Sequence, residues 1–150
     1  MGLMDHRKTW QFELKAAPDR CLTAFDVALN GRSAFSMRKA RWDVRRTTSG
    51  AGLPAAVGTY AGRDGAAALL MTFAGRSIAE DDQAAIGSEI SFEVRAHDRS
   101  TGRTKCAMWL SRRGVRMVDF TAQAGFLRAS MKDVASKLAE LDSSVTVTKI

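Results

Sequence analysis

Three residues near one predicted hairpin are of the types that nucleophilic catalysis uses. Cys106 supplies a thiol, His97 an imidazole and Asp98 a carboxylate, and a thiol beside a base is a strong nucleophile. The alternation of the flanking residues, however, places His97 and Asp98 at the hairpin tip and turns Cys106 toward the core. The sequence therefore predicts no catalytic residue, and enzymatic activity stays an open question.

Metal and cofactor sites are not predicted either. The chain has two cysteines, Cys21 and Cys106, and no metal-ligand spacing is present. Both fall on apolar faces of predicted elements, which indicates buried free thiols. The segment Gly50–Ala55 matches G-x-G-x-x-A, but a dinucleotide-binding turn needs a helix directly behind it. Because Val57–Tyr60 is typical of a strand, we interpret the segment as a glycine-rich turn and expect no cofactor.

The apolar residues expected to face inward could also line a ligand pocket. Methionine is flexible enough to fill a gap in a core or to form an adaptable ligand wall. A filled core and a lined cavity use the same residue types, so composition leaves both open. Tyr60 is the best candidate for a polar contact to a ligand. The candidate ligand-binding residues are Tyr60, Met71, Phe73, Phe92, Met108, Leu110, Phe120, Leu127 and Met131.

The chain is basic, with a formal net charge of +7. Much of this charge lies in residues 32–46 and 95–116, where Trp42 and Trp109 are interspersed. Trp109 is out of phase with its apolar neighbours, which predicts it on the outer face of its strand. Arg and Lys bind phosphates and indole rings stack on bases, so RNA, the ribosome or an acidic protein is an alternative partner. A solvated basic surface is the simpler interpretation, and we favour it.

Hydrophobic periodicity predicts the elements that must position these residues. Strict alternation indicates strands, and a period of about 3.6 residues indicates helices. Short polar turns between the later strands indicate antiparallel hairpins. The tail at 142–150 either adds a strand or packs loosely. The predicted strands are 8–15, 41–48, 57–61, 66–74, 89–97, 103–111 and 115–121, and the predicted helices are 18–29, a brief one near 34–38, and 124–141.

The last predicted helix is the element around which the others are organised. Leu127, Met131, Val134, Leu138 and Leu141 recur at alternating steps of four and three residues. This spacing puts them on one narrow stripe of a helix. Since the preceding segments are mostly strands, we expect the stripe to lie on one face of a sheet.

Size and composition favour one globular domain. The chain has 150 residues, of which 45% are hydrophobic and 26% charged, as in ordinary soluble domains. We predict a single domain over 1–150, with an N-terminal extension at 1–8 and a tail at 143–150. No apolar run is typical of a signal peptide or long enough for a transmembrane segment, so we expect a cytoplasmic protein.

The order of the predicted elements resembles that of a known superfamily. A strand at Thr9–Leu14 leads into a proline-started helix at Pro18–Leu29, and hairpins and a long closing helix follow. This order is similar to the helix-grip fold of the START and polyketide-cyclase (SRPBCC) superfamily over about Thr9–Leu141. The resemblance implies an α+β fold. A curved antiparallel sheet of about seven strands, in the order β-α-α-six β-α, would wrap around the long C-terminal helix.

The resemblance also implies a function. Proteins of this superfamily usually hold an apolar ligand between the long helix and the sheet, which favours a cavity over a filled core. We therefore expect binding of a hydrophobic small molecule or lipid. A cyclase- or aromatase-type enzyme using the same cavity is a further alternative, for which Asp119 and Arg46 are the candidate inward titratable groups. No catalytic residue of the superfamily matches a numbered position here.

Overall fold

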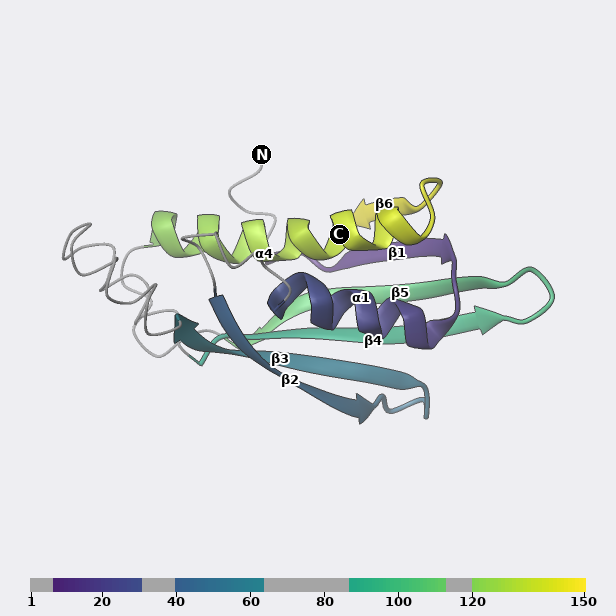
Figure 1. Ribbon diagram of the computed structural model, residues 1–150, viewed down its shortest axis with the longest axis horizontal. Helices are drawn as coiled ribbons and strands as arrows, with labels where there is room; N and C mark the ends of the chain where they lie inside the picture. Colours follow the sequence, from purple (N-terminus) through teal and green to yellow (C-terminus); the bar gives the residue numbers. More distant parts are fainter. Residues whose placement is uncertain (1–6, 31–39, 64–86, 113–119) are drawn as a thin grey trace.

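A computed structural model gives the protein's structure, and it describes residues 7–30, 40–63, 87–112 and 120–150. The described residues form an α+β fold with one sheet of six antiparallel strands and two helices. The strand order is β2-β3-β4-β5-β1-β6, so β2 and β6 are the edges of an open sheet (Figure 1). The elements are β1 Trp10–Lys15, α1 Pro18–Asn30, β2 Ala40–Thr48, β3 Pro54–Arg63, β4 Glu89–Asp98, β5 Arg103–Arg112, α4 Phe120–Leu141 and β6 Thr146–Lys149.

Most of the predicted elements that fall on described residues are confirmed. Five predicted strands correspond to β1 to β5 with ends shifted by a few residues, and the first helix is α1. The strand predicted at 66–74 and the brief helix near 34–38 lie outside the described residues. The prediction of a strand at 115–121 is wrong for its described end, because Phe120 and Thr121 begin α4.

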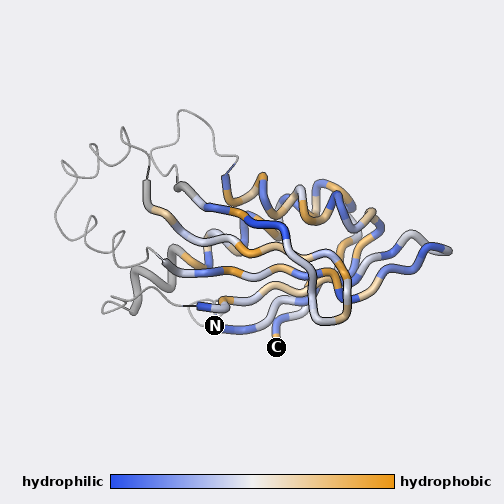
Figure 2. The backbone as a smooth tube through the Cα atoms, turned by 90° about the horizontal axis from the view of Figure 1, so that it is seen from below, coloured by the Kyte–Doolittle hydropathy of each residue, from blue (hydrophilic) through white to orange (hydrophobic). Residues whose placement is uncertain are grey.

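Both helices pack on the same face of the sheet, side by side (Figures 1 and 2). Helix α1 begins at Pro18, whose missing N–H has no partner in a first helical turn in any case. Its inward face carries Cys21, Leu22 and Phe25 into the core. The Phe25 ring stacks on Phe92 of β4 with a centroid distance of 5.1 Å, so α1 is fixed directly to the middle of the sheet.

Gly58 lets α1 approach the sheet closely. It lies on the inner face of β3, and a Cβ at this position would be 2.7 Å from Leu29 Cδ1 of α1. A glycine within a strand often marks such an approach of a second element. The Leu29 side chain thus occupies the space that a larger residue at position 58 would need.

Helix α4 places the predicted apolar stripe on the sheet. Leu127, Met131, Val134 and Leu138 are all completely buried, and Leu141 is partly buried at the end of the helix. Along the strands and helical turns, hydrophobic residues alternate with hydrophilic ones (Figure 2). The prediction of a one-sided final helix is confirmed. None of the helices in the described ranges is long and apolar enough to span a membrane.

The tail forms the edge strand β6. It pairs antiparallel with β1 from Trp10–Lys149 to Glu13–Thr146, and Lys149 Nζ lies 4.2 Å from the centroid of the Trp10 ring. Of the two alternatives for the tail, the structure therefore has the added strand. Because β6 follows α4 by a short turn, the C-terminal strand ties the end of this helix to the first strand of the chain.

Asp142 holds the turn between α4 and β6. Its carboxylate accepts hydrogen bonds from the Lys15 backbone N–H at 2.8 Å and from the Ser144 N–H at 3.0 Å. These bonds lower the pKa of Asp142 to about 2, and the bond from Lys15 has the largest effect. One exposed side chain thus joins the end of β1 to the turn before β6.

We expect Asp142→Asn to lower stability at neutral pH. The pKa of Asp142 is lower in the folded chain, at about 2, than the unfolded value of about 3.9. The charged form therefore adds stability above pH 4, and this contribution is lost as pH falls toward 2. Urea unfolding of wild type and variant should differ at pH 7 and converge near pH 2. Asp43→Asn, which removes an exposed carboxylate from β2, is the control and should not reproduce this convergence.

Candidate functional site

The structure brings six of the nine predicted ligand-binding residues to facing surfaces of the sheet and α4. Met71 and Phe73 lie outside the described residues. Phe120 was expected on a strand and is instead the first residue of α4. The six residues that meet at the interface are Tyr60 on β3, Phe92 on β4, Met108 and Leu110 on β5, and Leu127 and Met131 on α4.

This interface is tightly packed in the part of the chain that is described. Phe92, Met108, Leu127 and Met131 have no exposed surface. Leu110 differs from them, since it is only partly buried although its cross-strand partner Ile90 is completely buried. Both side chains belong to the face that carries the helices. The sheet is therefore less completely covered at the Leu110 end of β5 than in its middle.

Polar groups accompany the apolar ones near this end of the sheet. The Tyr60 backbone N–H donates to the Ser88 carbonyl at 2.9 Å, and the Gly87 N–H donates to the Tyr60 carbonyl at 2.9 Å. Gly87 has a φ of +91°, which glycine adopts at no steric cost. The Tyr60 ring lies 5.2 Å from that of Trp42. Tyr60 thus sits in an aromatic pair, within an otherwise apolar layer.

The two cysteines meet inside the core, a contact that the sequence pattern did not predict. Cys21 of α1 and Cys106 of β5 are both buried free thiols, and they form a hydrogen bond with each other. This hydrogen bond and burial raise the pKa of the Cys106 thiol, while the same bond lowers the pKa of Cys21. Helical periodicity predicts that Cys21 faces inward, and strand alternation predicts the same for Cys106. Only the position of α1 over the sheet brings the two thiols together.

The thiol, imidazole and carboxylate considered for nucleophilic catalysis do not form a catalytic group. His97 Nδ1 lies 2.8 Å from Thr104 Oγ1, and the Asp98 carboxylate accepts hydrogen bonds from Ser100. Cys106 is buried beside Cys21 instead. Among the described residues, no three or more His, Cys, Asp or Glu side chains are placed to hold a metal ion.

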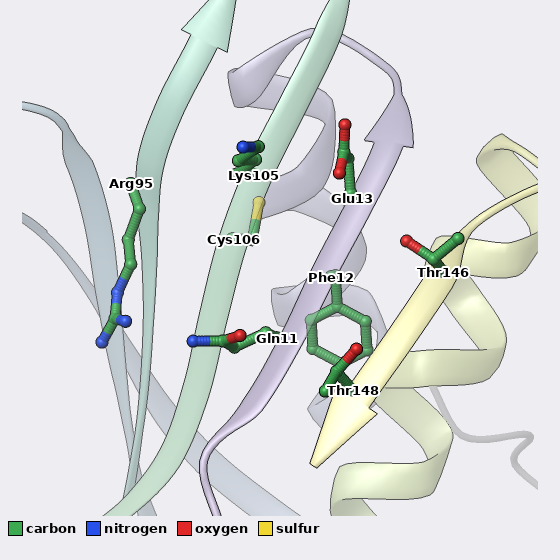
Figure 3. A pocket seen from close by; sticks show the side chains of 8 residues that line it. All are labelled: Gln11, Phe12, Glu13, Arg95, Lys105, Cys106, Thr146 and Thr148. Atoms are coloured by element: carbon green, nitrogen blue, oxygen red, sulfur yellow. The ribbon is translucent and has the colours of Figure 1, made fainter. Parts of the chain in front are cut away.

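A polar pocket of about 240 Å³ lies on the outer face of the sheet (Figure 3). In this view the helices lie behind the strands, and the side chains come from four neighbouring strands, β4, β5, β1 and β6. Sequence patterns do not predict this pocket, because one wall is β6 and the tail sequence is compatible with either an added strand or loose packing. Its lining residues are Gln11, Phe12, Glu13, Arg95, Lys105, Cys106, Thr146 and Thr148.

Two ion pairs frame the outer pocket. Arg103 Nε donates to Glu13 Oε1 at 3.1 Å, and Arg95 Nε donates to Glu93 Oε1 at 3.0 Å. The guanidinium carbon of Arg95 also lies 5.8 Å from the centroid of the Trp109 ring. Trp109 was predicted on the outer face of its strand, and the structure confirms this position because Trp109 pairs with Ser91 on that face.

A second pocket, of about 280 Å³, is a groove between the two helices. Its floor is apolar, with Ala24, Val27 and Leu141, and basic side chains stand on both sides. Val27 is 43% exposed. Lys137 on its rim is paired with Glu140 at 3.3 Å, and Arg20 lines the opposite side.

Comparison with known proteins adds no assignment. No protein-family model matches the chain, and no curated protein or solved structure does so either.

We expect both thiols to be unreactive in the folded protein. Cys21 and Cys106 are 0% and 2% exposed, so a thiol reagent such as DTNB should modify neither until the chain unfolds. In concentrated guanidinium chloride, which unfolds the chain, both should react. Rapid modification of either thiol under native conditions would show that α1 does not cover them stably.

Proposed function

We propose that the protein binds a hydrophobic small molecule or lipid between α4 and the helix-bearing face of the sheet. The observation that carries the proposal is the apolar stripe of α4 lying over methionine- and phenylalanine-containing strands, with Leu110 left partly exposed at one end. Burial of an apolar ligand there would contribute about 25 cal/mol per Å² of apolar surface removed from water.

The arrangement supports membership of the helix-grip class, which we propose as the family relationship. Strand, helix, antiparallel hairpins and a long final helix follow one another in the order that this fold shows. Two features differ from the predicted arrangement of one long C-terminal helix against a sheet. Helix α1 shares the sheet face with α4, and β6 follows the long helix and extends the sheet beyond β1.

Ligand entry is easiest at Leu110. The residues in the middle of the interface are fully buried, so a ligand there would have to displace side chains that already pack well. At Leu110 the side chain has both a buried side and an exposed side, and Met108 precedes it on the same face of β5. Methionine can change rotamer at small cost, which would let a pocket open inward from Leu110 toward Met108.

A cyclase-type enzyme is supported less well than a binding protein. Arg46, one of the two candidate inward groups, instead reaches α1, where Nη1 lies 3.4 Å from Asp19 Oδ1 and Nη2 lies 3.3 Å from Thr23 Oγ1. Asp119 lies outside the described residues. The described core-facing groups that could transfer a proton are therefore the Tyr60 hydroxyl and the Cys21–Cys106 pair.

A different observation favours the second predicted class, a basic module that contacts RNA, the ribosome or an acidic protein. Trp109 and Arg95 lie together on the outer face of the sheet, remote from the apolar interface. An indole beside a guanidinium is a combination that binds both a base and a phosphate. This face and the inner face could serve two ligands without conflict.

The apolar site is tested by filling its entrance. We expect cis-parinaric acid, a fluorescent fatty acid, to bind the wild-type protein, and Leu110→Trp to weaken this binding at least tenfold because the indole occupies the entrance. Leu141→Trp is the matched control, since Leu141 is also a partly buried leucine against the core but lies at the other end of α4.

Fluorescence titration gives the affinities, and thermal unfolding of both variants shows whether each is folded. Native mass spectrometry of the purified protein would reveal a ligand carried through purification. Absence of probe binding to the wild type, or equal loss in the two folded variants, would contradict the proposed site.

A further inference from the structure

The outer pocket is built from two rows of polar side chains that cross the strands. In one row Glu13 pairs with Lys105 on one side and with Thr146 on the other. In the next row Gln11 pairs with Thr148 and with Ala107. Residues two apart on a strand point to the same face, so these side chains all project from the side of the sheet that carries no helix. The register, rather than chance proximity, groups them.

Ala107 lies on the outer face beneath the side chains around it. It is completely buried although it belongs to the outer face, and its cross-strand neighbours are Gln11 and Glu93. Longer side chains therefore cover it, and the pocket of about 240 Å³ is lined by other residues of β4, β5, β1 and β6 (Figure 3).

A β-bulge places Arg95 at the pocket. Val94 pairs with Cys106 and Ala96 pairs with Lys105, so Arg95 is an extra residue on β4. Bulges commonly redirect a side chain. Here Arg95 Nε is fixed by Glu93 at 3.0 Å, and its guanidinium lies against Trp109. Since guanidinium carries five N–H donors, the terminal nitrogens of Arg95 stay available for a ligand.

The pocket holds positive charge and several donors that no other described residue engages. Glu13, its one carboxylate, is paired with Arg103 at 3.1 Å. Over the ranges that the structure describes, Lys105 has no hydrogen bond or ion pair, and the side chains of Gln11, Thr146 and Thr148 have none either. The pocket lining thus carries an ammonium, a guanidinium, two hydroxyls and an amide, supplied by four neighbouring strands.

We propose that this pocket binds a phosphate group of an RNA backbone or of a small phosphate ester. A phosphate presents several oxygen acceptors at once, which suits donors supplied by different strands. The core of a protein-binding surface is depleted of charge and rich in apolar contact, and this pocket is the opposite. Lys105 and Arg95 supply the charge, and Thr146, Thr148 and Gln11 supply neutral donors.

The position of Trp109 allows an experiment to distinguish an RNA ligand from a small phosphate ester. It lies on the same face of β5 as Lys105, four residues further on, which is about 13 Å along an antiparallel strand. A single-stranded RNA could place a phosphate at Lys105 and stack a base at Trp109, whereas a small ester would use the pocket alone. The site does not depend on the proposed apolar site, because the sheet lies between them.

The test measures binding of two probes to the full chain. Fluorescein-labelled oligo(U), followed by anisotropy at low and moderate salt, reports RNA, and 5′-AMP, followed by calorimetry, reports a small phosphate ester. Lys105→Gln removes the central charge. Lys132→Gln is the matched control, because Lys132 is an exposed lysine on α4 and therefore on the other side of the sheet.

We expect Lys105→Gln to lower the affinity for whichever probe binds at least fivefold. Lys132→Gln should change that affinity less than twofold. For oligo(U), the slope of log K against log salt should become shallower by about 0.7 on losing one phosphate contact. Loss of oligo(U) binding in Trp109→Ala identifies RNA, and unaltered 5′-AMP binding in that variant identifies a small ester. Absence of binding by both probes, equal weakening by the two lysine variants, or stronger binding of an oligoglutamate peptide would overturn the proposal.

Discussion

The burial of two apolar helix stripes on one face of a six-stranded sheet is the constraint on which the structure depends. An antiparallel sheet can cover one face and leave the other in water, and here α1 and α4 share the covered face. The Phe25–Phe92 stack and the completely buried residues of α4 make this layer dry. Gly58 matters for the same reason, since it leaves room for α1 to lie close to β3.

This one-sided covering divides the chain's chemistry between two faces. Side chains that alternate inward form the packed layer in which the Cys21 and Cys106 thiols meet. Those that alternate outward remain in contact with water, and there ion pairs such as Glu13–Arg103 hold their positions. The two faces therefore differ in chemistry, one apolar and one charged, and each is built from alternate residues of the same strands.

The C-terminal strand β6 contributes both to the anchoring of α4 on the inner face and to the pocket on the outer face. The turn at Asp142 directs the chain from the end of α4 to the free edge of β1, where β6 completes the sheet. The same short strand supplies Thr146 and Thr148 to the outer pocket. A segment for which the sequence left both an added strand and loose packing open thus helps to fix the end of the long helix, and it forms one wall of the outer pocket.

Local pattern was sufficient for most elements, because alternation and helical periodicity record which side of each segment is buried. The sequence by itself determined the apolar stripe of α4, the inward faces of β1, β4 and β5, and the outward position of Trp109. Tertiary structure decided the thiol contact, the place of β6 at the sheet edge and the rows of the outer pocket. Each of these depends on the register and order of strands far apart in the chain, which no local pattern encodes.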